Sequence, residues 1–167
     1  IDVSQNTILI KLGCRSNQLS SLDISKNTVL TDLYCDNNQL SSLDLTQNTA
    51  LKVLFSYNNQ LSSLDVTQNN DLFYLSCSNN QLTSLNVKNG NNSLITTFNA
   101  VNNPSLTCIQ VDNAANANAG TGVYSSWQKD SSCTYSEDCG YALSINDELL
   151  AKGLNLYPNP VTDVLTV

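Results

Sequence analysis

The stretch LTDLYCDNNQL, residues 30–40, decides the fold because its leucine, cysteine and asparagine spacing recurs along the chain. The pattern L-x-x-L-x-C-x-x-N-x-L also starts at residues 9 and 72, a copy with Ser56 in place of the cysteine starts at residue 51, and a looser copy starts at Ile95. A second phrase of the type L-D-V starts at residues 1, 22, 43, 64 and 85, which gives a period of 21 residues. Such a period predicts a solenoid, in which each repeat forms one coil and buries its apolar side chains against the next.

Alternation within the pattern predicts a short strand in each coil. In Leu33-Tyr34-Cys35 the first and third side chains point to one side and the second to the other. Stacked coils then form a parallel sheet with the leucine and cysteine columns inside. We therefore expect a leucine-rich-repeat solenoid of the mainly β class, with little or no helix. Its repeats span residues 1–111 as about five coils.

Asparagine recurs at the two places where each coil is expected to turn. The side-chain amides of these columns are suited to bond backbone groups that the turns leave unpaired. One column follows the predicted strand and the other follows the L-D-V phrase. They comprise Asn17, Asn38, Asn59, Asn80 and Asn103, and Asn6, Asn27, Asn48 and Asn69.

The cysteines divide into a repeat group and a C-terminal group. The inward column contains Cys14, Cys35 and Cys77, and small residues, Ser56 and Ala100, take the same position in the other coils. This replacement indicates that the cysteines have a packing role as buried thiols. Parallel side chains in register do not readily reach the dihedral angle of a disulfide. Zinc is a weak alternative, because the chain has no His and no C-x-x-C pair.

The region after the repeats, residues 112–140, is expected to be an irregular cap over the last coil, with Trp127 as its apolar anchor. It follows Cys108 and contains Cys133 and Cys139, so one of these three cysteines is left over. A Cys108–Cys139 disulfide is the favoured pairing, and the state of Cys133 stays open.

Composition excludes several classes of function. The formal net charge of −7 disfavours nucleic acids and anionic membranes as partners, since both require clustered Lys and Arg. The absence of His removes the commonest general base and metal ligand. No apolar run is long enough to span a bilayer. We expect a non-enzymatic, monomeric protein that needs no cofactor and binds no metal.

The repeat together with the exit NPSLTCIQVD (103–112) and the close SEDCG (136–140) resembles leucine-rich-repeat proteins secreted by Bacteroidetes-type bacteria. The end LYPNPVTDVLTV (156–167) resembles the start of a type IX secretion sorting domain. Residues 141–153, between these two regions, are expected to be a linker, and the resemblance implies a truncated sorting domain over 154–167. It also implies a secreted or outer-membrane-surface protein that is exported by the type IX machinery through this tail.

Outward positions of the strands are where a ligand is expected, because the inward columns form the core. The candidate ligand-binding residues are Asp32, Tyr34, Asp36, Phe55, Tyr57 and Tyr74. Clustered exposed aromatic side chains on a rigid surface favour a binding patch for a protein or glycan. The flanking residues Asn37, Asn58 and Asn79 add hydrogen-bonding groups. Alternatively, these aromatic residues only favour strands and cover one another.

The aspartates of the L-D-V phrases form a further column that invites a cation such as calcium. Each is followed two residues later by Ser or Thr, so local bonding to the backbone explains the column equally well. The column comprises Asp2, Asp23, Asp44 and Asp65.

Three functional hypotheses remain. The favoured one is an extracellular recognition scaffold that binds protein or glycan through the outward strand face. The second is an accessory or spacer module of a larger secreted enzyme with an upstream catalytic domain. The third is a structural stalk without a ligand.

Overall fold

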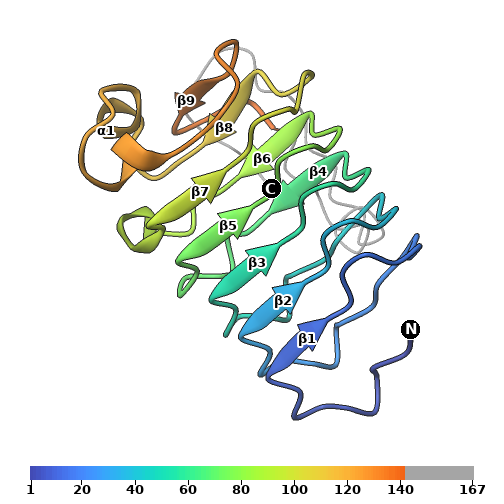
Figure 1. Ribbon diagram of the computed structural model, residues 1–167. Helices are drawn as coiled ribbons and strands as arrows, with labels where there is room; N and C mark the ends of the chain where they lie inside the picture. The colour runs from blue at the N-terminus through green and yellow to red at the C-terminus, as the bar shows by residue number, and fades with distance from the viewer. Residues whose placement is uncertain (142–167) are drawn as a thin grey trace, which may run out of the picture.

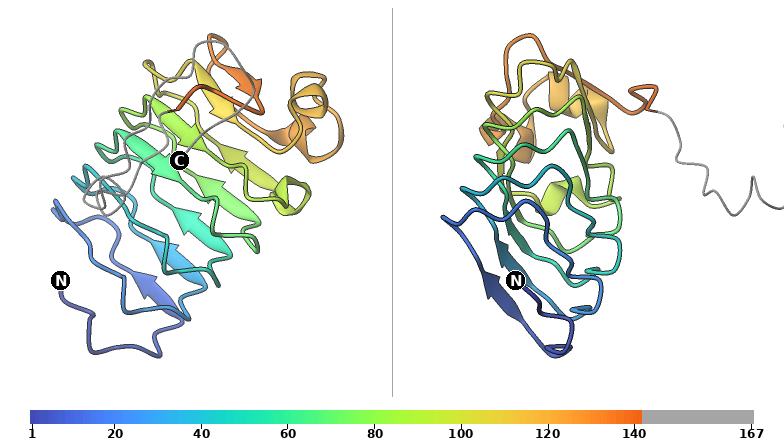
Figure 2. Two further views of the ribbon diagram at one scale, coloured as in Figure 1. Left: turned by 180° about the vertical axis from the view of Figure 1, so that it is seen from behind. Right: turned by 90° about the vertical axis from the view of Figure 1, so that its right-hand side faces the viewer.

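The computed structural model describes residues 1–141, in which the chain winds into stacked coils that end in a cap (Figures 1 and 2). The predicted sorting segment, and the predicted linker apart from Tyr141, lie outside these residues. Each coil contributes one strand to sheet A, whose order is β1-β2-β3-β5-β7. These strands are β1 (Lys11–Gly13), β2 (Asp32–Tyr34), β3 (Val53–Phe55), β5 (Tyr74–Ser76) and β7 (Thr97–Asn99). All neighbours pair in parallel, which confirms the predicted solenoid.

A second parallel sheet, sheet B, was not predicted. It has the order β4-β6-β8-β9, and its first three strands come from the L-D-V side of the later coils. The strands are β4 (Ser63–Asp65), β6 (Ser84–Asn86), β8 (Cys108–Gln110) and β9 (Thr134–Ser136). The signal for it was the alternation in Leu64-Asp65-Val66, where the leucine and valine are buried and the aspartate is exposed. The inward side chains of both sheets form one hydrophobic core.

Register is uniform along the stack, so each inward column runs straight through the core. Leu33 pairs with Leu54 and Leu54 with Leu75, and all three are fully buried. The cysteine column is also buried, and Cys14, Cys35 and Cys77 are free thiols as predicted. Burial raises the pKa of the Cys77 thiol to about 12, which leaves it protonated and unreactive at neutral pH.

From the second coil onward, the asparagine that follows a sheet A strand bonds in both directions. In coil three, the Asn59 amide nitrogen donates to the carbonyl oxygens of Cys35 and Ser56, each at 3.1 Å. Its carbonyl oxygen accepts from the Leu40 backbone nitrogen at 3.0 Å. The residue before it, Asn58, has a φ of 54°, a left-handed conformation that asparagine tolerates better than most residues.

The asparagine that follows the L-D-V phrase bonds in one direction only. The Asn48 amide nitrogen donates to the carbonyl oxygens of Ile24 and Asn27 at 3.0 and 2.9 Å. Its own carbonyl oxygen is buried without a hydrogen-bond partner, as are those of Asn27 and Asn69. Both columns are therefore structural ladders, but the two turns of a coil are not built in the same manner.

The cap continues the solenoid for part of another coil. It contains α1 (Ala114–Asn118), the short 3-10 helix η2 (Gly122–Ser126) and β9, which pairs with β8; a further 3-10 turn, η1 (Asn92–Leu94), precedes β7. Trp127 is buried, stacks on Phe98 with ring centroids 4.3 Å apart, and donates from its ring nitrogen to the Ile95 carbonyl oxygen at 2.8 Å. These contacts confirm Trp127 as the anchor of the cap.

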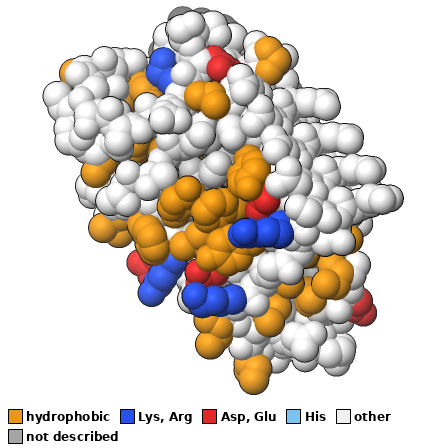
Figure 3. Space-filling model, in the orientation of Figure 1, with side chains coloured by type: hydrophobic (Ala, Val, Ile, Leu, Met, Phe, Trp, Pro, Cys, Tyr) orange, Lys and Arg blue, Asp and Glu red, His pale blue; other side chains and the backbone are white. Residues whose placement is uncertain are grey.

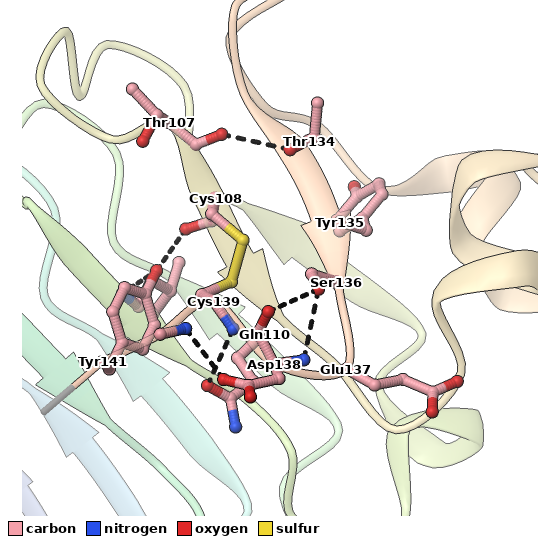
Figure 4. The surroundings of a disulfide bond; sticks show 12 residues. Thr107, Cys108, Gln110, Thr134, Tyr135, Ser136, Glu137, Asp138, Cys139 and Tyr141 are labelled. Atoms are coloured by element: carbon pink, nitrogen blue, oxygen red, sulfur yellow. Dashed lines mark hydrogen bonds between the residues drawn. A yellow bond between two sulfur atoms is a disulfide. The ribbon is translucent and has the colours of Figure 1, made fainter. Parts of the chain in front are cut away.

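A disulfide joins Cys108 in β8 to Cys139 at the end of the cap, as predicted (Figure 4). Cys133 remains a free, buried thiol, which resolves the odd count of cysteines in this region. The Tyr141 hydroxyl donates to the Cys108 carbonyl oxygen, so the Tyr141 side chain lies against sheet B. None of the helices within residues 1–141 is long and apolar enough to cross a membrane.

Candidate functional site

The outward face of sheet A carries a cluster of four aromatic rings, Tyr34, Phe55, Tyr57 and Tyr74, which we call the aromatic cluster. Phe55 lies at its centre, with the Tyr74 ring stacked at 4.5 Å and the Tyr34 ring tilted at 5.2 Å. Tyr57 meets Phe55 edge-on at 6.1 Å. All four side chains are partly exposed. Figure 3 shows hydrophobic side chains gathered over the middle strands of sheet A.

The parallel register places these rings together. Tyr34 and Phe55 are directly paired positions of β2 and β3, and Tyr74 is paired with Val53 at the start of β3. Neighbouring strands lie about 4.8 Å apart, so aromatic side chains on them must touch. The sequence therefore predicted the cluster, and the contacts among its rings are those of the alternative interpretation, in which the aromatic residues cover one another.

Arg15 completes one side of the cluster, although no functional role was predicted for it. Its guanidinium lies over the Tyr34 ring, 4.7 Å from the centroid, and 5.9 Å from the centroid of Phe55. Its Nε atom lies 3.6 Å from a carboxylate oxygen of Asp36. Its position in the repeat could have identified this role, because Arg15 occupies the same outward column as Asp36, one coil earlier.

Asp32 and Asp36 were predicted to be exposed on the outward face, but both are buried. Their exposed fractions are 9% and 1%, because side chains of adjacent coils cover them. Asp32 accepts from the Tyr34 hydroxyl at 3.2 Å and forms an ion pair with Lys11 at 3.4 Å. The pKa of Asp32 is nevertheless lowered: burial acts to raise it, and hydrogen bonds from Thr31, Lys11 and Tyr34 outweigh that effect.

Asp36 acts as a buried anchor for its neighbours. One carboxylate oxygen accepts from the Asn37 amide at 2.7 Å, and the other faces Arg15 without a hydrogen bond. A side-chain hydrogen bond with Asp36 raises the pKa of Tyr57, and partial burial raises it further. The Asn37 side-chain oxygen also accepts from the Asn58 amide at 2.8 Å, so these two asparagines bond to each other between neighbouring coils.

The aspartate column on the other side of the coils is occupied by local bonding. The carboxylates of Asp23, Asp44 and Asp65 accept from backbone nitrogens two residues later at 2.8–2.9 Å. These bonds supply the structural role that the sequence offered as the alternative to calcium. Within residues 1–141, no group of three or more His, Cys, Asp or Glu residues is arranged to hold a metal ion.

Comparisons with known proteins support the fold. No family model matches the chain, and no curated protein sequence matches it. Among solved structures, the chain is similar to the functional domain of InlJ from Listeria monocytogenes, which includes a cysteine ladder. The TM-score is 0.58 and the identity 34%, over 68% of this chain and 28% of that one. The chain thus spans less than a third of that structure. Together with the parallel coils, this likeness shows that the chain is a leucine-rich-repeat solenoid.

Proposed function

We propose that this protein is a non-enzymatic recognition scaffold that binds an extracellular protein or glycan through the aromatic cluster. The observation that carries the proposal is the cluster itself, a set of partly exposed rings fixed on a rigid parallel sheet. Aromatic side chains in such positions provide most of the binding energy in many interfaces. A leucine-rich-repeat solenoid suits this role because its stacked strands present one continuous surface.

An extracellular location is part of the proposal. The Cys108–Cys139 disulfide fits an oxidising compartment. The resemblance of the end of the chain to a type IX sorting segment further supports export by that route. The test is whether fusion of residues 154–167, with the remainder of such a domain, directs a reporter to the surface of a type IX-competent bacterium.

Substitution of Phe55 by alanine tests the binding role. We expect a loss of affinity of about 30-fold or more for the ligand identified on protein and glycan arrays, as at interface hot spots. Leu94→Ala is the matched control, because Leu94 is an exposed apolar residue in η1, outside the cluster. Equal binding by the wild-type protein and the Phe55→Ala variant, with both folded, rules out the aromatic cluster as the binding surface.

A further inference from the structure

The exposed charged residues within the four regular copies of the pattern are of one sign, whereas the exposed Asp71 lies just before the fourth copy. The four regular copies of the pattern cover residues 9–19, 30–40, 51–61 and 72–82. The exposed charged residues within them are all basic, namely Lys11, Arg15 and Lys52. The two carboxylates in the same copies, Asp32 and Asp36, are buried beneath their partners. Figure 3 shows Lys and Arg side chains at the edge of the hydrophobic patch, with acidic side chains beside them. The exposed part of this border within the four copies is basic, although the chain has a formal net charge of −7.

Arg15 is held in place but keeps part of its binding capacity. Asp36 faces its Nε atom, and Tyr34 lies beneath the guanidinium plane, while the side chain remains 52% exposed. Its terminal N–H groups are the donors that bind a carboxylate with two parallel hydrogen bonds. Because the side chain is already oriented, less conformational entropy is lost when a ligand binds.

Gly13 opens space next to this arginine. A Cβ atom at Gly13 would meet no heavy atom within 4 Å, and its φ is not positive, so neither packing nor backbone conformation requires glycine there. Gly13 ends β1 and pairs with Tyr34 across the sheet, two residues after Lys11 and two residues before Arg15. The surface of sheet A therefore carries no side chain at Gly13, which lies beside Tyr34 and between the basic residues Lys11 and Arg15.

The rings themselves argue against a neutral sugar as the ligand. Phe55 has a ring on either side, contributed by β2 and β5, and Tyr34 lies under the Arg15 guanidinium. Sugar C–H groups pack against open ring faces, which are the electron-rich part of the ring. The centre of the cluster instead offers ring edges and hydroxyl groups.

We propose that the sheet A face binds an acidic protein segment, with an apolar or aromatic side chain against the cluster and carboxylates on Lys11 and Arg15. This inference rests on the proposed recognition function and names the partner chemistry for the same surface. Charge complementarity selects the partner, since the remainder of the acidic molecule repels it.

The test uses a random copolymer of glutamate and tyrosine as the probe, with surface plasmon resonance as the readout. We expect the wild-type protein to bind it, and the Lys11→Gln/Arg15→Gln variant to bind at least tenfold more weakly. Glutamine at residue 15 keeps an N–H group beside Asp36, and thermal melting checks that the variant folds. The control Lys26→Gln/Lys88→Gln removes two exposed positive charges that follow L-D-V-type phrases and should change affinity less than twofold.

Polygalacturonate, dextran and a lysine–tyrosine copolymer provide the other arms. The inference is overturned if the glutamate–tyrosine copolymer does not bind, if polygalacturonate or dextran binds as tightly, or if both double variants lose affinity equally. If an array ligand depends on Phe55 but not on Lys11 and Arg15, the acidic-partner inference fails and the recognition function stands. If no ligand depends on Phe55, the recognition function fails.

Discussion

Sheets A and B belong to the same coils, yet they arrange their outward polar side chains in different ways. On sheet A, charged groups pair between coils, with Lys11 and Arg15 of the first coil on Asp32 and Asp36 of the second. On sheet B, an aspartate such as Asp65 bonds to its own backbone. The outward charged side chains on the sheet A side (side A) therefore couple neighbouring coils, whereas the aspartates on the sheet B side (side B) bond within their own coil.

The asparagine ladders repeat this contrast in the interior. Asn59, after sheet A, uses both its amide nitrogen and its carbonyl oxygen, whereas Asn48 uses only its nitrogen. Side B has a different reinforcement, the disulfide that ties β8 to the end of the cap. The same residue type at the same period thus stabilises the two sides to different extents.

The largest expected effect comes from removal of this disulfide. The Cys108→Ser/Cys139→Ser variant should lose about 3–4 kcal/mol of unfolding free energy, because the bridge closes a loop with a sequence separation of 31. Urea denaturation measures the loss, and the wild-type protein under a reducing agent should match the variant. Hydrogen exchange should show that the β9 amides lose protection first. A loss below about 1 kcal/mol would show that side B does not need the covalent tie.

A paired substitution in the two ladders is expected to have a somewhat smaller effect. Asn59→Ala should cost about 3 kcal/mol, since it leaves the buried Leu40 N–H without an acceptor and removes bonds to carbonyl groups. Asn48→Ala should cost about 1–2 kcal/mol, because the carbonyls it releases keep other donors and its own unpaired oxygen is removed. Urea unfolding of both variants measures the difference. Equal losses would contradict the distinction between the ladders.

Much of sheet A and of the core could be predicted from the sequence, because the repeat period sets which residues share a column. The solenoid, the buried cysteine column and the Cys108–Cys139 pair were all predicted. Sheet B was missed because Leu64-Asp65-Val66 alternates over too few residues to distinguish a strand from a turn. At the candidate site, the period correctly brought Tyr34 and Phe55 together. It did not show how deeply Asp36 is buried, since burial depends on where the side chains of adjacent coils extend.

The smallest expected effect concerns the aspartates of side B. A backbone hydrogen bond from Ser25 lowers the pKa of Asp23, so its contribution to stability is present above the unfolded-state pKa near 3.8 and is lost as the pH falls through the lower folded-state value. Asn86 makes the same bond with a neutral amide. Asp23→Asn should therefore change the melting temperature at pH 7 by less than about 3 °C.

Melting curves of the Asp23→Asn variant between pH 2 and 7 provide the measurement. Its melting temperature should depend less on acid than that of the wild-type protein. A large loss at pH 7 would instead show that the negative charge itself has a role in the column.

The presence of strands in two different parts of the coil has a consequence for the shape of the array. A solenoid bends when one part of each coil occupies more length along the axis than another. In the coils that have both sheets, each part advances by the same strand spacing of about 4.8 Å. Each added coil of this kind therefore lengthens both sides by the same fixed step. A partner on sheet A would meet rows of side chains at that regular spacing.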